Sequence, residues 1–497
     1  MKRALSPYVV ASVAVAGLIA VPTVVAPNVQ TRAVALMDNI AYVVGGSGDP
    51  IPSADEVTTN FDLFIKPLYP SYIAEALFTP EGNYALYTGV KSLTLDASEA
   101  QGAEILDKTI TQQVAGGNDI VVKGASQSST ISGLVMSELA GHVSDSKLSF
   151  VLTGDPNLPN GGLFERLDGL TLPALGITFN GATPSDLFPT TIYTQEYDGF
   201  ADVPKYPINL LSDINSVLGI QYVHPTYTTL TPDQIAPESE SNPGGAILLP
   251  GSEDYGSGTA DSMTNYYMIP TADLPLLDPL RSIPVVGAPL ADLLQPDLTV
   301  LVNLGYDNPN PLEGWDAGPA NVPTEFGLFP SLDQILGALR LLPSQTELGI
   351  QNFVGDLTGS GPNPVSLPSL SSLTALLDSS SGASSTLADP AALLSGLSLA
   401  GIASDLSNVV HALTAAVSTA YATVLPTADV VTTVLTAVPT YDFTLFAQGI
   451  DAGNLVEAIG QPIATDTYLL PLAVGFETFV VIDQASTVIG DLSGLLP

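Results

Sequence analysis

The sequence predicts an α/β fold in which helices flank a mainly parallel sheet, followed by a mainly helical or loosely ordered C-terminal extension. The first observation is that short β-branched runs alternate with helical stretches over residues 36–310, as in strands joined by crossover helices. The second is that 45% of the 497 residues are apolar, which is ample for a sizeable core. Residues 36–310 are therefore expected to form one globular domain.

The individual elements follow from local patterns along this domain. Apolar and β-branched runs predict strands at Ala41–Val44, Asp119–Lys123, Leu148–Leu152, Thr190–Tyr197 and Leu298–Leu304. A helix is expected over Ala97–Val114, because its apolar residues recur on one side, and another over Gln127–Leu139.

A segment rich in Pro, Ser and Gly, residues 225–273, precedes the last predicted strand. It has the composition of a long irregular loop, and such loops in compact domains are usually functional. This insertion is therefore expected to act as a lid or as an acceptor surface.

The composition changes after about residue 311. No Lys or Arg follows Arg340, and Ser366–Ser398 is low in complexity. Residues 403–425 and 429–438 are expected to be helical. Leu406–Leu425 carries no formal charge, but Ser, Thr, Asn and His interrupt its apolar character. Packing within a small helical domain is favoured there over membrane association, and no role is indicated for residues 311–497.

The N-terminus has the pattern of an export signal. Lys2 and Arg3 precede an apolar run over Tyr8–Val25, and Ala33-Val34-Ala35 fits a cleavage site for such a signal. Residues 1–35 are thus expected to be a cleaved signal peptide or a retained membrane anchor. Either outcome predicts an exported protein of the cell envelope or the medium.

Charge and residue usage exclude several classes of function. The chain has 50 acidic and 12 basic residues, a formal net charge of −38, so its surface should repel nucleic acid and anionic lipid headgroups. Contact with membrane or envelope lipid is expected to be apolar. Cysteine is absent and there are three histidines, so neither a metal site nor a cofactor is expected.

The central chemical signal is Gly124-x-Ser126-x-Ser128, which lies between a predicted strand and a predicted helix. In α/β-hydrolases the nucleophilic serine lies on such a turn, and small residues on either side let the turn close. Ser128 stands where glycine is usual, and this geometry tolerates serine. The context favours Ser126 as a nucleophile over an ordinary turn with Ser126 as a helix cap.

A serine nucleophile needs a base, and the three histidines make this a strong test. His142 follows the helix that leads away from the site, and His411 lies in an apolar helical stretch of the C-terminal region. His224 precedes Pro225, which biases it towards an extended loop. Its place after the serine also fits the order Ser, Asp or Glu, His of this fold, so His224 is the predicted base.

The acid is expected after a strand and before His224. Asp198 and Asp202 both follow the predicted strand at Thr190–Tyr197. Asp198 is favoured because it lies at the strand end and a glycine turn follows it, whereas Asp202 could instead brace the next segment. The acid would fix the tautomer of His224 and stabilise its imidazolium form.

An oxyanion hole is also predicted. The backbone N–H of Gln127, directly after the nucleophile, is one expected donor. The glycine-rich loop at Gly46 and Ser47 can bring a second N–H or the Ser47 hydroxyl to the same oxygen, because glycine permits close backbone approach. A phosphate-binding loop is disfavoured, since no lysine follows and Pro50 and Pro52 interrupt the helix that it would need.

With these residues in place, the chain resembles the PE-PPE-domain family of mycobacterial serine hydrolases, relatives of the cutinases. The resemblance spans about residues 41–308 and rests on five blocks in order: YVVGGSGDPIPS (42–53), GASQSS (124–129), YDGFADVPKYPINLLSDIN (197–215), YVHPTY (222–227) and PDLTVLVNLGYDNP (296–309). It implies an α/β-hydrolase fold and Ser-Asp-His catalysis at Ser126, Asp198 or Asp202, and His224. The chain departs from the family by an export segment in place of the helical PE or PPE module.

The residues and the resemblance together predict an exported carboxylic-ester hydrolase that acts on acyl or lipid esters. The alternative is an acyltransferase that moves acyl chains between envelope glycolipids such as acyl-trehaloses, in which a sugar hydroxyl replaces water. A third alternative is a non-catalytic envelope surface protein that has kept the fold. The correct order of all three triad residue types disfavours this last reading.

Overall fold

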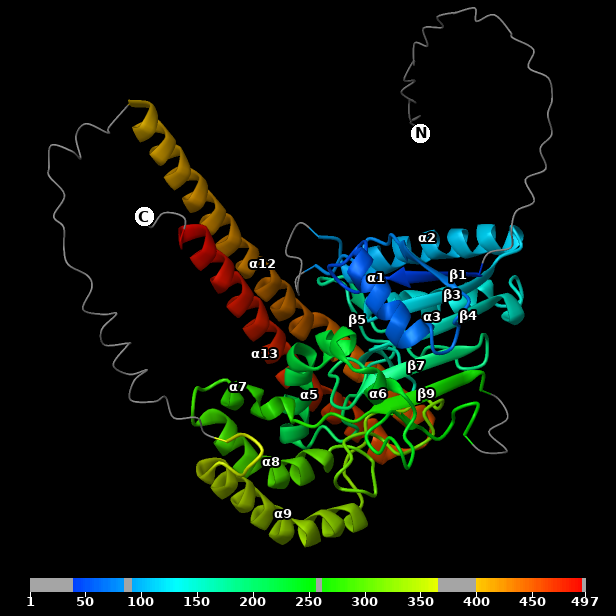
Figure 1. Cartoon of the computed structure of the whole chain (residues 1–497), viewed down its shortest axis with the longest axis vertical. Helices are drawn as coiled ribbons and strands as arrows, with labels where there is room; N and C mark the ends of the chain where they lie inside the picture. Colours follow the sequence, from blue (N-terminus) through cyan, green and yellow to red (C-terminus); the bar gives the residue numbers. More distant parts are fainter. Residues whose placement is uncertain (1–38, 85–91, 256–261, 365–398, 494–497) are drawn as a thin grey trace, which may run out of the picture. The chain divides into compact units, whose positions relative to one another are not determined.

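The computed structural model describes residues 39–84, 92–255, 262–364 and 399–493. Its sheet is built from β1 (Asn39–Val44), β2 (Ile73–Leu77), β3 (Asp119–Ala125), β4 (Leu148–Thr153), β7 (Thr190–Gln195), β8 (Ile247–Leu248) and β9 (Thr264–Ile269). The strand order is β2-β1-β3-β4-β7-β9-β8, and all neighbours are parallel except β8, which runs antiparallel to β9 (Figure 1). A separate hairpin pairs β5 (Thr171–Leu172) with β6 (Ile177–Thr178).

The helices are α1 (Ala54–Asn60), α2 (Leu95–Ala115), α3 (Gln127–Leu139), α4 (Leu163–Arg166), α5 (Leu210–Tyr222), α6 (Pro232–Ile235), α7 (Asp278–Arg281), α8 (Gly287–Asn303), α9 (Leu332–Thr358), α12 (Leu399–Asp451) and α13 (Leu455–Ser493). Short helical turns are η1 (Phe61–Ile65), η2 (Asp145–Lys147), η3 (His224–Thr229) and η4 (Pro275–Leu277). The predicted fold class, a mainly parallel sheet with flanking helices and a helical C-terminal region, is confirmed.

Both faces of the central strands β1, β3, β4 and β7 are buried, which explains the nearly continuous apolar runs in β1, β3 and β4. Alternate residues such as Val122 and Leu152 pack against Leu106 and Ile131 of α2 and α3. The intervening strand residues face the opposite side of the sheet. There they form a second buried cluster, which includes Phe64 of η1. The catalytic candidates lie where these strands end, at the carboxyl edge of the sheet.

The strand predicted at Leu298–Leu304 is wrong. These residues form the end of α8, which packs against α9 and α5. A short apolar run cannot be assigned to strand or buried helix by periodicity alone. Pro296 lies two residues before the run, and proline ordinarily interrupts a helix, yet here the helix continues through it.

The insertion predicted at residues 225–273 is not one irregular loop. It contains η3, α6, β8 and β9, and β9 pairs with β7 as part of the main sheet. Of its described residues, Pro225, Tyr227 and Thr228 line the cavity beside Ser126. The expectation of one long irregular loop is therefore wrong, since a strand of the main sheet lies within this segment; its role as a lid or an acceptor surface stays a prediction.

The C-terminal region forms a hairpin of two long helices, α12 and α13, which pack against each other (Figure 1). The predicted helices at residues 403–425 and 429–438 are parts of the single helix α12, which continues through Pro426. The hairpin is not a separate domain, because its buried residues Tyr441, Tyr468 and Leu472 join the core cluster around Val217 and Ile220.

By length and composition alone, Leu425–Asp451 and Leu455–Ala485 are each apolar enough to cross a bilayer. Each of these helices packs one side on the domain and leaves large apolar side chains exposed on the other, such as Leu435, Phe443 and Leu470. The predicted export segment at residues 1–35 and the low-complexity stretch at Ser366–Ser398 lie outside the described residues.

Candidate active site

Ser126 lies on a tight turn between β3 and α3. Its backbone has φ 55° and ψ −119°, a strained conformation for a residue with a side chain. The turn needs a small residue at Gly124, because a Cβ there would lie 2.9 Å from the Ser128 carbonyl oxygen and 3.0 Å from Leu152 Cδ2. Ser128 fits where glycine is usual, since its Oγ accepts a 2.7 Å hydrogen bond from the N–H of Ala125.

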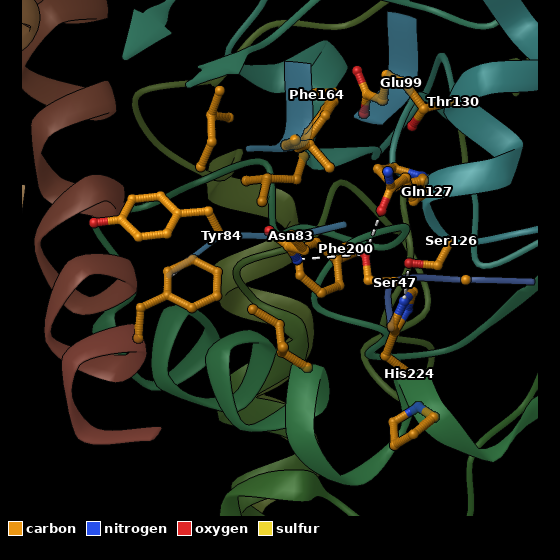
Figure 2. A pocket seen from close by; sticks show the side chains of 18 of the residues that line it. Ser47, Asn83, Tyr84, Glu99, Ser126, Gln127, Thr130, Phe164, Phe200 and His224 are labelled. Atoms are coloured by element: carbon orange, nitrogen blue, oxygen red, sulfur yellow. Dashed lines mark hydrogen bonds between the residues drawn. The ribbon is translucent and has the colours of Figure 1, made fainter. Parts of the chain in front are cut away.

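His224 connects the serine to a buried carboxylate. Its Nε2 lies 2.8 Å from Ser126 Oγ (Figure 2). Its Nδ1 lies 2.8 and 2.9 Å from the two carboxylate oxygens of Asp198. The side chain of His224 is 12% exposed and that of Asp198 is fully buried. The structure thus brings Ser126, His224 and Asp198 into one hydrogen-bonded chain.

The two acid candidates have different surroundings. Asp198 also accepts hydrogen bonds from the N–H of Phe200 at 2.9 Å and from the hydroxyl of Tyr227 at 2.7 Å. Asp202 instead accepts a 2.8 Å hydrogen bond from the N–H of Tyr197 and so braces the turn. Burial raises the pKa of Asp202 well above its usual range.

Two residues that support the base are absent from the sequence prediction. Tyr227 holds Asp198 and in turn accepts a 2.9 Å hydrogen bond from the N–H of Gln195, at the end of β7. Gly154 has φ 55°, and a Cβ there would lie 3.0 Å from His224 Cε1 and 3.1 Å from Asp198 Oδ2. Tyr227 ends the YVHPTY block, which was the available signal; Gly154 carries no local signal.

The predicted oxyanion residues surround the same serine. Gly46 lies against it, because a Cβ on Gly46 would be 3.3 Å from the Ala125 carbonyl oxygen and 3.4 Å from Ser126 Cβ. Ser47 Oγ donates a 2.9 Å hydrogen bond to Gln127 Oε1 and accepts a 3.4 Å bond from Asn83 Nδ2 (Figure 2). Gln127 opens α3, where backbone N–H groups have no partner within the helix.

The other two histidines lie away from this site. His142 is exposed in the turn after α3, and His411 is exposed on α12. Among the residues that the structure describes, no group of three or more histidine or acidic side chains is arranged to hold a metal ion.

A cavity of about 500 Å³ opens beside Ser126 and His224, a size typical of small-ligand sites. One part of its wall is polar and includes Ser47, Asn83, Glu99 and Thr130 (Figure 2). Glu99 is 4% exposed, and its Oε1 has no hydrogen-bond partner among the described residues. Burial raises the pKa of Glu99 well above its usual range.

Sequence comparisons place this geometry in a family. The model of the PE-PPE domain matches residues 70–307. An uncharacterized PPE family protein of Mycobacterium tuberculosis, PPE28, is 42% identical over 476 residues, which cover 93% of this chain and 68% of that protein. Esterase PE16 of the same organism is 46% identical over 295 residues, 58% of this chain, and the chain spans about half (51%) of its length.

Two weaker similarities were also found. SL1278 acyltransferase Chp1 of M. tuberculosis is 25% identical over 229 residues, 45% of this chain and 52% of that protein. A cutinase-like protein from Cryptococcus sp. covers 33% of this chain and 79% of its own, at 16% identity and a TM-score of 0.23. A structural similarity this low does not bear on the fold, which is described from the strand order above. The extent of the match to PPE28 and the domain match show that the chain belongs to the PE-PPE domain family.

Proposed function

We propose that this protein is a serine esterase that hydrolyses acyl or lipid esters through an acyl-enzyme intermediate. The single observation that carries the proposal is the chain of short hydrogen bonds from Ser126 through His224 to Asp198. A nucleophile bonded to a base, and a base held by a buried carboxylate, is the arrangement of serine hydrolases on unrelated folds. The 46% identity to an esterase, PE16, supports the same reaction class.

The first half of the reaction transfers the acyl group to the enzyme. Ser126 Oγ attacks the ester carbonyl carbon while its proton passes to His224 Nε2. The buried carboxylate of Asp198 binds Nδ1 of His224. It keeps the proton on that nitrogen in place and stabilises the imidazolium form of the ring. The tetrahedral intermediate then collapses, the C–O bond to the alcohol breaks, and His224 returns the proton to the leaving oxygen.

The negative oxygen of the tetrahedral intermediate needs hydrogen-bond donors. The backbone N–H groups of Gln127 and Ser47 are the proposed donors. The Ser47 hydroxyl, which donates to Gln127 Oε1 at 2.9 Å and accepts from Asn83 Nδ2 at 3.4 Å, holds the loop in position. A preorganised donor of this kind contributes about 10²–10³ in kcat. In the second half, His224 takes a proton from water, which attacks the acyl-enzyme and releases the acid and Ser126.

Acyl transfer is the second candidate function. It shares every step up to the acyl-enzyme, after which an acceptor hydroxyl attacks instead of water. The unpartnered Oε1 of Glu99 in the cavity wall favours it, because a buried carboxyl group can hydrogen-bond a sugar hydroxyl. The similarity to acyltransferase Chp1 points the same way, but the identity to the esterase is higher.

The proposed site of action is the cell envelope. The export signal expected at residues 1–35 supports secretion or anchoring outside the cytoplasm. The exposed apolar side chains on the outer side of the C-terminal hairpin support apolar association with membrane or envelope lipid.

The test is covalent labelling of the purified full chain by a fluorophosphonate probe, together with hydrolysis of p-nitrophenyl butyrate. We expect Ser126→Ala and His224→Ala to abolish labelling and to lower kcat by about 10⁶-fold. The matched control is His142→Ala, which removes an exposed histidine and should label like the wild type. Failure of the folded wild-type protein to label would favour the non-catalytic alternative.

A further inference from the structure

We propose that the C-terminal hairpin of α12 and α13 is the acyl-binding wall of the active site, so that a long unbranched acyl chain lies between the hairpin and the α/β domain. This inference rests on the proposed esterase function and assigns its substrate class. The hairpin lies outside the residues matched by the PE-PPE domain model, which end at 307.

The hairpin supplies a large part of the cavity that begins at Ser126. From α12 the cavity is lined by Val430, Thr433 and Val434, and from α13 by Leu472, Phe476 and Val480. The hairpin side chains that line the cavity are apolar except for the Thr433 hydroxyl and the carboxylate of Glu477, which accepts a 2.8 Å hydrogen bond from Thr427. Such a wall binds hydrocarbon and offers little to a sugar or a peptide backbone, whose polar groups would lose their hydrogen bonds to water.

The α/β domain supplies apolar side chains opposite the hairpin, apart from the polar patch described above. Leu163 and Phe164 of α4 line the same cavity, as do Leu172, Ile177 and Phe179 around the β5–β6 hairpin. The cavity therefore has reacting groups at one end and hydrocarbon on both sides, which is the shape that an acyl ester requires.

An aromatic contact connects the hairpin to the catalytic base. The ring of Phe200 lies 4.7 Å from the imidazole of His224 and 6.4 Å from the ring of Phe476 on α13. The hydrocarbon-lined part of the cavity thus begins directly at the reacting serine and histidine. An acyl chain attached to Ser126 would enter it with its first methylenes.

The hairpin is fixed to the domain by buried polar contacts as well as by apolar packing. Tyr84 donates a 2.7 Å hydrogen bond to Asp429 at the cavity. Tyr441 donates to the Asp168 carbonyl oxygen at 2.9 Å, and the hydroxyl of buried Tyr468 lies 3.1 Å from Ser216 Oγ. The wall is therefore part of the folded domain and is in place before substrate binds.

The experiment measures kcat/KM for p-nitrophenyl acetate, butyrate, octanoate and laurate, each below its micelle concentration. We expect the wild type to gain up to about fourfold per methylene, since each buried CH₂ is worth about 0.8 kcal/mol, until the cavity is full. Ala473→Trp, which fills the cavity from α13, should lower the laurate-to-butyrate ratio by at least about tenfold.

The matched control is Val474→Trp, the same change at the next residue, whose side chain is 59% exposed; its ratio should equal that of the wild type. Val430→Trp, from the cavity side of α12, and its exposed neighbour Val431→Trp repeat the comparison on the other helix. Circular dichroism and thermal melting check that each variant is folded.

The outcomes separate the two proposals. A wild type that labels with fluorophosphonate but shows no chain-length preference, or cavity and control variants with equal ratios, would overturn the acyl-wall inference and leave the esterase in place. A folded protein that neither labels nor hydrolyses any ester would overturn both.

Discussion

Asp198 and Asp202 lie on the same turn after β7 but have different hydrogen-bond partners, so substitutions of the two residues test which of them is the acid. Asp198 contacts His224, whereas Asp202 accepts a hydrogen bond from the N–H of Tyr197. We expect Asp198→Asn to lower kcat on p-nitrophenyl butyrate by about 10⁴-fold, because the amide cannot stabilise the imidazolium or enforce its tautomer.

Asp202→Asn is the control for that change, because the amide has nearly the shape of the carboxyl group and its oxygen can still accept the hydrogen bond from Tyr197. Its kcat should stay within a few-fold of the wild type. An inactive Asp202→Asn beside an active Asp198→Asn, both folded by circular dichroism, would reverse the assignment of the acid.

At the scale of residues, the sequence predicts the reacting groups better than their supports. Ser126 and His224 follow from a local motif and from the shortage of histidine, and the structure brings them within 2.8 Å. Tyr227 could be found only through the YVHPTY block, and Asn83 and Gly154 carry no local signal, since their contacts with the site depend on how distant segments of the chain align.

At the scale of elements, the turn from β3 to α3 depends on Gly124. We expect Gly124→Ala to lower the free energy of unfolding by about 1–3 kcal/mol, because its Cβ would meet backbone and Leu152 at 2.9–3.0 Å. Urea unfolding measures this change. Gly244→Ala is the control, since a Cβ there would have no atom within 4 Å; equal stabilities of the two variants would contradict the packing argument.

Strands that are buried on both faces were predicted correctly, and partly exposed ones were missed. The predicted strands at β1, β3, β4 and β7 are almost completely buried on both faces. By contrast, β2 is an edge strand whose residues are exposed or half-buried, and β9 lies within a stretch of loop-like composition. In a strand of five or six residues that is only partly buried, the alternation of apolar and polar residues is too weak to identify the strand from the sequence.

At the scale of the whole molecule, the sequence gives no indication that the C-terminal helices complete the active-site cavity. Helices in residues 403–438 could be predicted from composition, but their docking depends on contacts between distant parts of the chain. The bond between Ser216 and Tyr468 joins residues 252 positions apart. An apolar face shows that a helix is buried against something, without naming its partner.

Buried carboxyl groups distributed over the molecule predict how its stability depends on pH. Burial raises the pKa of Glu81 to about 8, of Glu196 to about 7, of Asp155 to about 6 and of Asp213 to about 9. In the unfolded chain these groups titrate near 4. Between these values the folded state binds more protons, so the free energy of unfolding falls as pH rises.

Two other effects bear on the same curve. The net charge of −38 adds self-repulsion as carboxylates ionise. Burial lowers the pKa of Lys123 to about 7, which works in the opposite direction, because the unfolded chain then binds the extra proton. The contribution of Lys123 begins only above about pH 7. Below pH 7 the buried carboxyl groups therefore determine how the free energy of unfolding changes with pH.

We therefore expect the thermal midpoint to fall by several degrees from about pH 5.5 to about pH 7, measured by differential scanning calorimetry at constant ionic strength. Asp213 contributes strongly, since neither of its carboxylate oxygens has a hydrogen-bond partner among the described residues. Asp213→Asn, which cannot ionise, should flatten the curve, whereas Asp233→Asn at an exposed position should follow the wild type. A midpoint that rises across this range in the wild type would mean that these carboxyl groups are ionised and solvated in the folded protein.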